Sequence, residues 1–159
     1  KSFSKPITCN DIKAPEKIPV SDTPKIFLAG SIEMGLAHPW QEEITDQLKD
    51  YDVVLINPRR DIWDSSWKQE KEHPEFRAQV EWELNGLSTA DYIVIYFDPE
   101  TKSPISLLEL GLYADSGNVF VVCPDGFWRK GNVDIVCERY VIPQFRNVNE
   151  VVDHIKTLL

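Results

Sequence analysis

The chain has 159 residues, of which 26 are Asp or Glu and 17 are Lys or Arg, so its formal net charge is −9. This acidic balance excludes a protein that binds the nucleic-acid backbone through a basic surface. No apolar run reaches the roughly 20 residues that span a bilayer, and the three cysteines lack metal-ligand spacing and indicate a reducing compartment. We therefore expect one cytoplasmic domain, with neither nucleic acid nor a membrane as a partner.

The hydrophobic pattern divides the chain into an arm and a domain. Residues 1–24 contain four prolines and no hydrophobic period, which predicts an extended, proline-rich arm ahead of a domain at residues 25–159. Short apolar runs within the domain predict buried strands at 25–29, 52–57, 92–97, 119–123 and 140–142. Apolar spacing typical of helices begins near Trp40, Phe76, Ser106 and Val148.

Strands that alternate with helices in this way predict parallel crossover connections. We therefore predict an α/β fold with a flavodoxin-like, doubly wound sheet of five parallel strands and helices on both faces. Ligands of such sheets bind beyond the carboxyl ends of the strands. This rule directs attention to four loops, at residues 30–31, 57–67, 98–106 and 124–132.

These loops lack the usual phosphate-binding and nucleophile motifs. The sequence contains no Gly-x-Gly-x-x-Gly, no Walker-type loop and no nucleophile elbow. The first strand of the domain ends in Ala29-Gly30-Ser31, without the acidic residues of a phospho-receiver. Carboxylate chemistry remains as the main option.

Glu109 is the first candidate carboxylate. It follows the predicted strand at 92–97 and lies one turn into a helix predicted from Ser106. Helix amides at such a position favour an ionised carboxylate, which suits a nucleophile. The alternative interpretation is a capping box, in which Glu109 reaches back to the backbone amide of Ser106 and only starts the helix.

Glu83 is the second candidate carboxylate. Helical spacing places Val80, Leu84 and Leu87 on one buried face, with Glu83 beside it toward the carboxyl end of the sheet. The alternative interpretation is a solvated helix face, which is the usual place of a glutamate.

Several short motifs together resemble the nucleoside 2-deoxyribosyltransferase family. They are Phe27-Leu-Ala-Gly-Ser31, Glu83-Leu-Asn-Gly-Leu87, the Ala90-Asp91 step into a strand and Glu109-Leu-Gly-Leu-Tyr-Ala114, and Glu72-His-Pro-Glu75 adds to the match. The resemblance covers residues 25–145 and implies a flavodoxin-like fold. It also implies cleavage or transfer at the N-glycosidic bond of a (deoxy)nucleoside or nucleotide, through a covalent glycosyl intermediate on Glu109.

The resemblance implies further roles and partners. Glu83 would position the nucleophile or relay a proton. The family's transferases often carry an aspartate six residues before the nucleophile, where this chain has Ser103. We expect Asp98, earlier in the same loop, to replace that aspartate as the general acid. Ser103 would then bind a sugar hydroxyl or a 5′-phosphate. No metal or organic cofactor is implied, and the expected assembly is a homo-oligomer whose pocket is shared between subunits.

Loop positions supply the candidate substrate-binding residues. Arginines there are expected to meet a base edge or a phosphate, tryptophans to stack on a nucleobase, and Asn132 to replace an amide that the family contributes across a subunit interface. Surface ion pairs and sheet-edge or subunit-interface packing are the competing explanations. The candidates are Gly30, Ser31, Asn57, Arg59, Arg60, Trp63, Ser103, Ser106, Trp128 and Asn132.

Two other functions stay open at this point. One is a non-catalytic module of the same fold that binds or senses a nucleotide. The other is a hydrolase of a larger nucleotide such as NAD, which would use the same two carboxylates.

Overall fold

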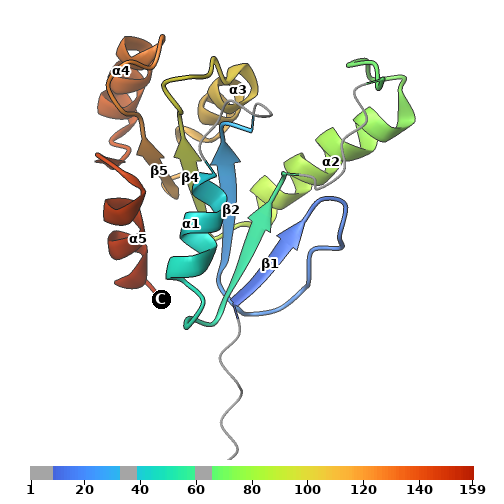
Figure 1. Ribbon diagram of the computed structural model, residues 1–159, viewed down its shortest axis with the longest axis horizontal. Helices are drawn as coiled ribbons and strands as arrows, with labels where there is room; N and C mark the ends of the chain where they lie inside the picture. Colours follow the sequence, from blue (N-terminus) through green and yellow to red (C-terminus); the bar gives the residue numbers. More distant parts are fainter. Residues whose placement is uncertain (1–8, 33–38, 60–65) are drawn as a thin grey trace, which may run out of the picture.

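The computed structural model describes residues 9–32, 39–59 and 66–159. These residues form one parallel sheet of six strands, flanked by helices on both faces (Figure 1). The strands are β1 (Cys9–Lys13), β2 (Lys25–Gly30), β3 (Val53–Asn57), β4 (Tyr92–Tyr96), β5 (Val119–Val122) and β6 (Gln144–Phe145). Their order across the sheet is β1-β3-β2-β4-β5-β6, so the last five have the flavodoxin-like arrangement and the predicted fold class is confirmed.

The sheet has six strands in the described residues, where five were predicted. The additional strand, β1, lies within the segment predicted as an extended arm and pairs in parallel with β3. Its apolar pattern is short because Asn10 and Asp11 precede Ile12, which is 6% exposed and joins the core. Proline-rich flanks and a single core residue leave little hydrophobic signal for a strand.

The last strand also differs from its prediction at residues 140–142. Tyr140 ends the helix α4 (Lys130–Tyr140), and Val141 turns the chain with a φ of 56°, in the left-handed region. Strand β6 follows only at Gln144. The apolar run Tyr140-Val141-Ile142 is therefore a helix end and a turn, of which Ile142 alone is buried.

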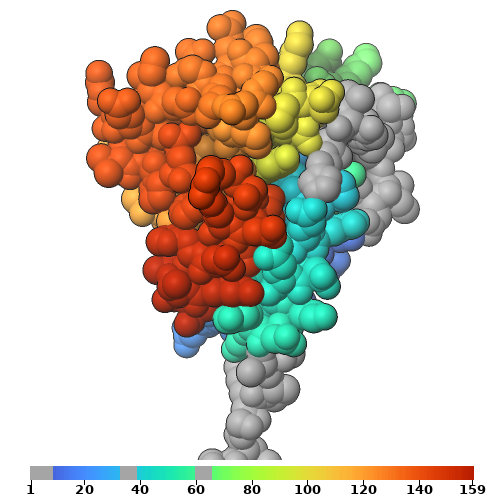
Figure 2. All heavy atoms as spheres, turned by 60° about the vertical axis from the view of Figure 1, so that its left-hand side comes forward, coloured from blue at the N-terminus to red at the C-terminus, as the bar shows by residue number. Residues whose placement is uncertain are grey.

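Helices cover the two faces of the sheet unequally. One face packs against α2 (Pro74–Thr89), α3 (Pro104–Tyr113) and α4, and the other against α1 (Trp40–Gln47) and α5 (Val148–Lys156). Neighbouring residues of β2 separate into these two cores, Phe27 with Leu87 of α2 and Leu28 with Trp40 of α1. Figure 2 shows α5 lying beside α1 on the surface. None of the described helices has both the length and the apolarity to cross a membrane.

The carboxyl ends of β2 and β4 meet at the point where the strand order reverses. The chain leaves β2 toward β3 on one side, whereas β4 lies on the other side of β2. Gly30 ends β2 so close to its neighbours that a Cβ there would lie 2.5 Å from the Tyr96 carbonyl oxygen and 2.7 Å from the Trp40 ring. Only glycine permits this contact, which brings β2 and β4 together at the edge where such folds bind ligands.

A second glycine sets how closely α2 approaches the sheet. A Cβ on Gly86 would lie 2.8 Å from the ring of Phe27 and 3.0 Å from the side chain of Ile56. The backbone of α2 therefore rests directly on β2 and β3. Glu83 lies one turn before Gly86, so this packing also determines how near Glu83 comes to the sheet.

Gly86→Ala is expected to lower the free energy of unfolding by about 1–3 kcal/mol, because the added methyl group overpacks the contact with Phe27. Urea denaturation measures the change. The matched control is Gly131→Ala in α4, where a Cβ would meet nothing within 4 Å and alanine is the better helix former. Equal effects of the two substitutions would contradict the close approach of α2.

Candidate functional site

Glu109 lies in the second turn of α3, at the carboxyl end of β4. The helix begins at Pro104 with Ser103 as its N-cap residue, two positions earlier than predicted. Ser106 is therefore an interior helical residue, and the capping box that would pair it with Glu109 does not form. Glu109 itself is only 8% exposed. Its carboxyl group is thus enclosed by protein rather than used to start its own helix.

Glu83 lies on the stripe of α2 that faces the sheet. The buried residues of this helix include Gln79, Gly86 and Leu87, whereas Leu84 is 40% exposed. The predicted buried face is therefore wrong at Leu84. The spacing of Gln79, Glu83 and Gly86 corresponds to one face of a helix, and Glu83 is half-buried. This position excludes a fully solvated helix face for Glu83.

The two carboxyl groups interact electrostatically. Burial, and then the negative charge of Glu83, raise the pKa of Glu109 from 4.5 to about 8. The prediction of an ionised Glu109 is therefore wrong for the ligand-free chain at neutral pH. The physical reason is that burial of the carboxyl group and the nearby charge of Glu83 both disfavour the ionised form, and neither effect was visible in the helical spacing.

Three buried hydroxyl groups join β2 to the start of α3. Thr101 Oγ1 lies 2.9 Å from Ser31 Oγ and 2.7 Å from Ser103 Oγ, and the two serine oxygens are 2.5 Å apart. We call these three residues the hydroxyl ring. Ser31 and Ser103 were predicted as substrate ligands, and the structure brings them together but directs their hydroxyls toward each other. Thr101 was missed, because a threonine in a polar loop carries no distinctive sequence signal.

Asp98 organises the loop between β4 and α3. Its Oδ1 accepts a hydrogen bond from the backbone amide of Glu100 at 2.8 Å, and its own amide donates to Ser31 Oγ at 2.8 Å. The side chain is 3% exposed. These contacts account for an aspartate at this turn, and its role as a general acid stays a prediction.

Asn57 and Arg59 leave the carboxyl end of β3. Asn57 is buried, and its Oδ1 accepts a hydrogen bond from the backbone amide of Arg59 at 3.0 Å. The Arg59 guanidinium lies 3.5 Å from Oε1 of Gln41 in the first turn of α1. Arg60 and Trp63, the other candidates from this loop, lie outside the described residues.

Trp128 and Asn132 follow the carboxyl end of β5. Trp128 is half exposed, and its ring nitrogen donates to the carbonyl oxygen of Lys102 at 2.9 Å, next to Ser103. The guanidinium of Arg129 lies 4.5 Å from the centroid of the same ring. The indole thus packs on the loop that carries the hydroxyl ring. Asn132 is exposed near the start of α4.

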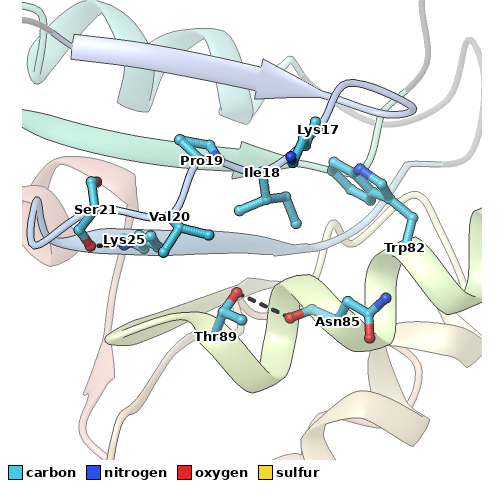
Figure 3. Close-up of a pocket in the computed structure, with 9 residues that line it drawn as sticks. All are labelled: Lys17, Ile18, Pro19, Val20, Ser21, Lys25, Trp82, Asn85 and Thr89. Atoms are coloured by element: carbon cyan, nitrogen blue, oxygen red, sulfur yellow. Dashed lines mark hydrogen bonds between the residues drawn. The ribbon is translucent and has the colours of Figure 1, made fainter.

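Two surface hollows lie away from the carboxylates. The larger, of about 450 Å³, lies between residues 17–21 and α2 and includes Trp82, Asn85 and Thr89 in its wall (Figure 3). The smaller, of about 190 Å³, lies between α1, the end of β4 and the start of α5. Neither is lined by Glu83 or Glu109. We therefore define the candidate site by the two carboxyl groups rather than by a hollow. It lies at the edge where β2, β4, α2 and α3 meet.

Comparisons with known proteins identify the family and support the fold of the chain. A family model described as nucleoside 2-deoxyribosyltransferase like matches residues 23–127, a range that includes Glu83 and Glu109. No curated protein matches the chain. The crystal structure of a conserved protein from Enterococcus faecalis V583 is similar in fold, with a TM-score of 0.59 and 17% identity over 86% of this chain and 99% of that one. Because the family match covers well over half of the sequence, the chain belongs to the nucleoside 2-deoxyribosyltransferase-like family.

Proposed function

We propose that the protein is an enzyme that breaks the N-glycosidic bond of a (deoxy)nucleoside or nucleotide, with Glu109 as the nucleophile. Membership of the family supports nucleoside glycosyl transfer as the general chemistry. The observation that carries the proposal is the carboxyl pair, in which Glu109 is buried and Glu83 is near enough to raise its pKa. Two such groups at the reversal point of a parallel sheet suit a reaction at a sugar carbon.

The raised pKa of Glu109 suggests how the pair is prepared for the reaction. In the ligand-free protein at neutral pH, Glu109 holds a proton. A nucleophile must be ionised and a leaving base must be protonated, so both needs are met when the proton moves from Glu109 to Glu83. The pair then contains one carboxylate and one carboxylic acid, which are the two groups that a retaining glycosidic cleavage uses.

The chemical steps follow from this distribution of protons. A carboxylate oxygen of Glu109 forms a bond to carbon 1′ of the sugar while the bond from carbon 1′ to the base nitrogen breaks. Glu83 donates its proton to the departing base. Water or a second base then attacks carbon 1′, releases Glu109 as a carboxylate and returns a proton to Glu83. Water makes the overall reaction a hydrolysis, and a second base makes it a transfer.

Glu109→Gln is expected to lower base release by at least about 10³-fold, because an amide cannot form the glycosyl ester. The assay incubates the protein with nucleosides and their 5′-monophosphates, with and without a second free base, and separates the products by mass. Glu138→Gln, an exposed change of the same kind in α4, is the control and retains the wild-type rate. Unchanged release by Glu109→Gln would exclude Glu109 as the nucleophile. No release by wild-type protein would exclude this function and favour a nucleotide sensor.

Stability is expected to fall as pH rises from about 5 to about 8. Folded Glu109 keeps its proton over this range whereas the unfolded side chain loses it, so the folded state binds more protons and is favoured at the lower pH. The loss is about 5 kcal/mol when complete above the folded pKa, since each pKa unit between 4.5 and about 8 corresponds to about 1.4 kcal/mol. Denaturation of wild-type protein and Glu109→Gln at several pH values measures it. If Glu109→Gln leaves the pH dependence of the free energy of unfolding unchanged, the raised pKa of Glu109 is contradicted.

We further propose that a second copy of the chain packs against the outer face of α3. Ile105, Leu108 and Leu112 form an apolar stripe there, each more than half exposed. Ile105 and Leu112 lie four residues before and three after Glu109, so the stripe borders the carboxyl group. The exposed positions of α3 carry no charge, which allows two copies of an acidic chain to meet at this face. This contact supports a pocket shared between subunits.

Leu108→Glu is expected to convert the oligomer to monomers, because it places a charge in the centre of the stripe. Sedimentation velocity measures the species present. Val20→Glu, at a side chain that is 98% exposed, is the control and leaves the oligomer intact. A monomeric wild-type protein, or an oligomer that tolerates Leu108→Glu, would exclude this interface.

A further inference from the structure

Thr101 is a buried side chain of the loop between β4 and α3, and its hydroxyl group has several partners. It is 4% exposed, and its Oγ1 contacts Ser31 at the end of β2 and Ser103 at the start of α3. The same oxygen lies 3.0 Å from the carbonyl oxygen of Asp98, within the loop itself. One hydroxyl group thus touches three separate parts of the chain at the edge of the sheet.

The three hydroxyls of the ring contact one another and two backbone carbonyl groups. Thr101 Oγ1 is placed to donate to the Asp98 carbonyl oxygen at 3.0 Å and Ser31 Oγ to the Tyr96 carbonyl oxygen at 3.3 Å. Each hydroxyl has a single proton, so these carbonyl groups and the neighbouring hydroxyls compete for it. The backbone amide of Asp98 donates a further bond to Ser31 Oγ and anchors the ring to the loop. Removing Thr101 Oγ1 opens the ring and leaves two buried serine hydroxyls with fewer partners.

The ring also holds Ser103 in a conformation that it does not adopt by preference. Ser103 has a φ of 46°, in the left-handed region, and it precedes Pro104. A serine at an N-cap position ordinarily bonds to the amides of its own helix, but Ser103 makes no such cap and bonds to the ring instead. A strained backbone of this kind persists when surrounding contacts impose it, and such sites often serve function.

We propose that Thr101 is a positioning residue that holds the start of α3 against the end of β2 and thereby sets Glu109 opposite Glu83. The helix transmits the restraint, because Glu109 lies six residues, or about 9 Å, beyond Ser103 along α3. Figure 1 shows α3 near the arrowheads of β2 and β4. A small displacement of a reacting group costs a large part of the rate. The catalytic consequence rests on the proposed function, whereas the positioning itself does not.

Thr101→Val removes the hydroxyl group while keeping the shape of the side chain. It is expected to lower kcat for base release by at least about tenfold with KM within about twofold, because the binding groups remain but the nucleophile is misplaced. Thr101→Ser keeps the hydroxyl and is expected to restore the rate. Thr157→Val, which removes an exposed hydroxyl bonded to the carbonyl oxygen of His154, is the matched control and leaves the rate unchanged.

A second measurement separates this inference from the proposed function. The pKa of the Glu109 carboxyl group is followed by carbon NMR in wild-type protein and in the three threonine variants. Loosening α3 admits water and increases the distance to Glu83, so Thr101→Val is expected to lower that pKa toward its ordinary value, whereas the other two variants retain it. This result holds whether or not the protein releases a base.

Unchanged kcat together with an unchanged Glu109 pKa in a folded Thr101→Val protein would overturn the proposal. If Thr101→Val does not fold, Ser103→Gly takes its place, because it opens the same ring and relieves the left-handed backbone. The expected pKa shift of Glu109 is the same for this variant. A wild-type pKa in Ser103→Gly would likewise exclude a positioning role for the ring.

Discussion

The contact between the carboxyl ends of β2 and β4 is the constraint on which the candidate site depends. Gly30 lets the two strands meet at the carbonyl group of Tyr96, and the Ser31 amide donates a hydrogen bond to that same oxygen at 2.9 Å. The hydroxyl ring then continues the contact from Ser31 into the start of α3. A helix held at its N-cap residue presents Glu109 at a defined place, while Gly86 brings Glu83 close from the neighbouring helix.

Burial gives these two carboxyl groups their chemistry. An isolated exposed glutamate is ionised at neutral pH and is a weak nucleophile in water. Enclosure by α2, α3 and the sheet raises the pKa of Glu109, and the charge of Glu83 raises it further. In our proposal the pair holds one proton and moves it between its members during glycosyl transfer. The energetic cost of burying an acid is then part of the function rather than a defect of the core.

The predictions from sequence succeeded where hydrophobic pattern decides the structure. Unbroken apolar runs located β2, β3, β4 and β5, and the order of strands and helices indicated the doubly wound sheet. They failed where one or two residues decide it. Pro104 after Ser103 starts α3 two residues earlier than predicted. Burial of Glu109 beside Glu83 raises its pKa, whereas the helical spacing alone predicted an ionised carboxylate. Thr101 and β1 were missed because a buried threonine in a loop, and a strand with Asn10 and Asp11, resemble ordinary polar segments.

The covalent step is the central claim and is open to direct measurement. Wild-type protein is incubated with a nucleoside or nucleotide whose 2′-fluorine slows the second step, then weighed intact and after proteolysis. The account predicts a mass increase equal to one fluorinated sugar, or its 5′-phosphate, on the peptide that contains Glu109. Base release without any adduct, or an adduct on another residue, would contradict the account.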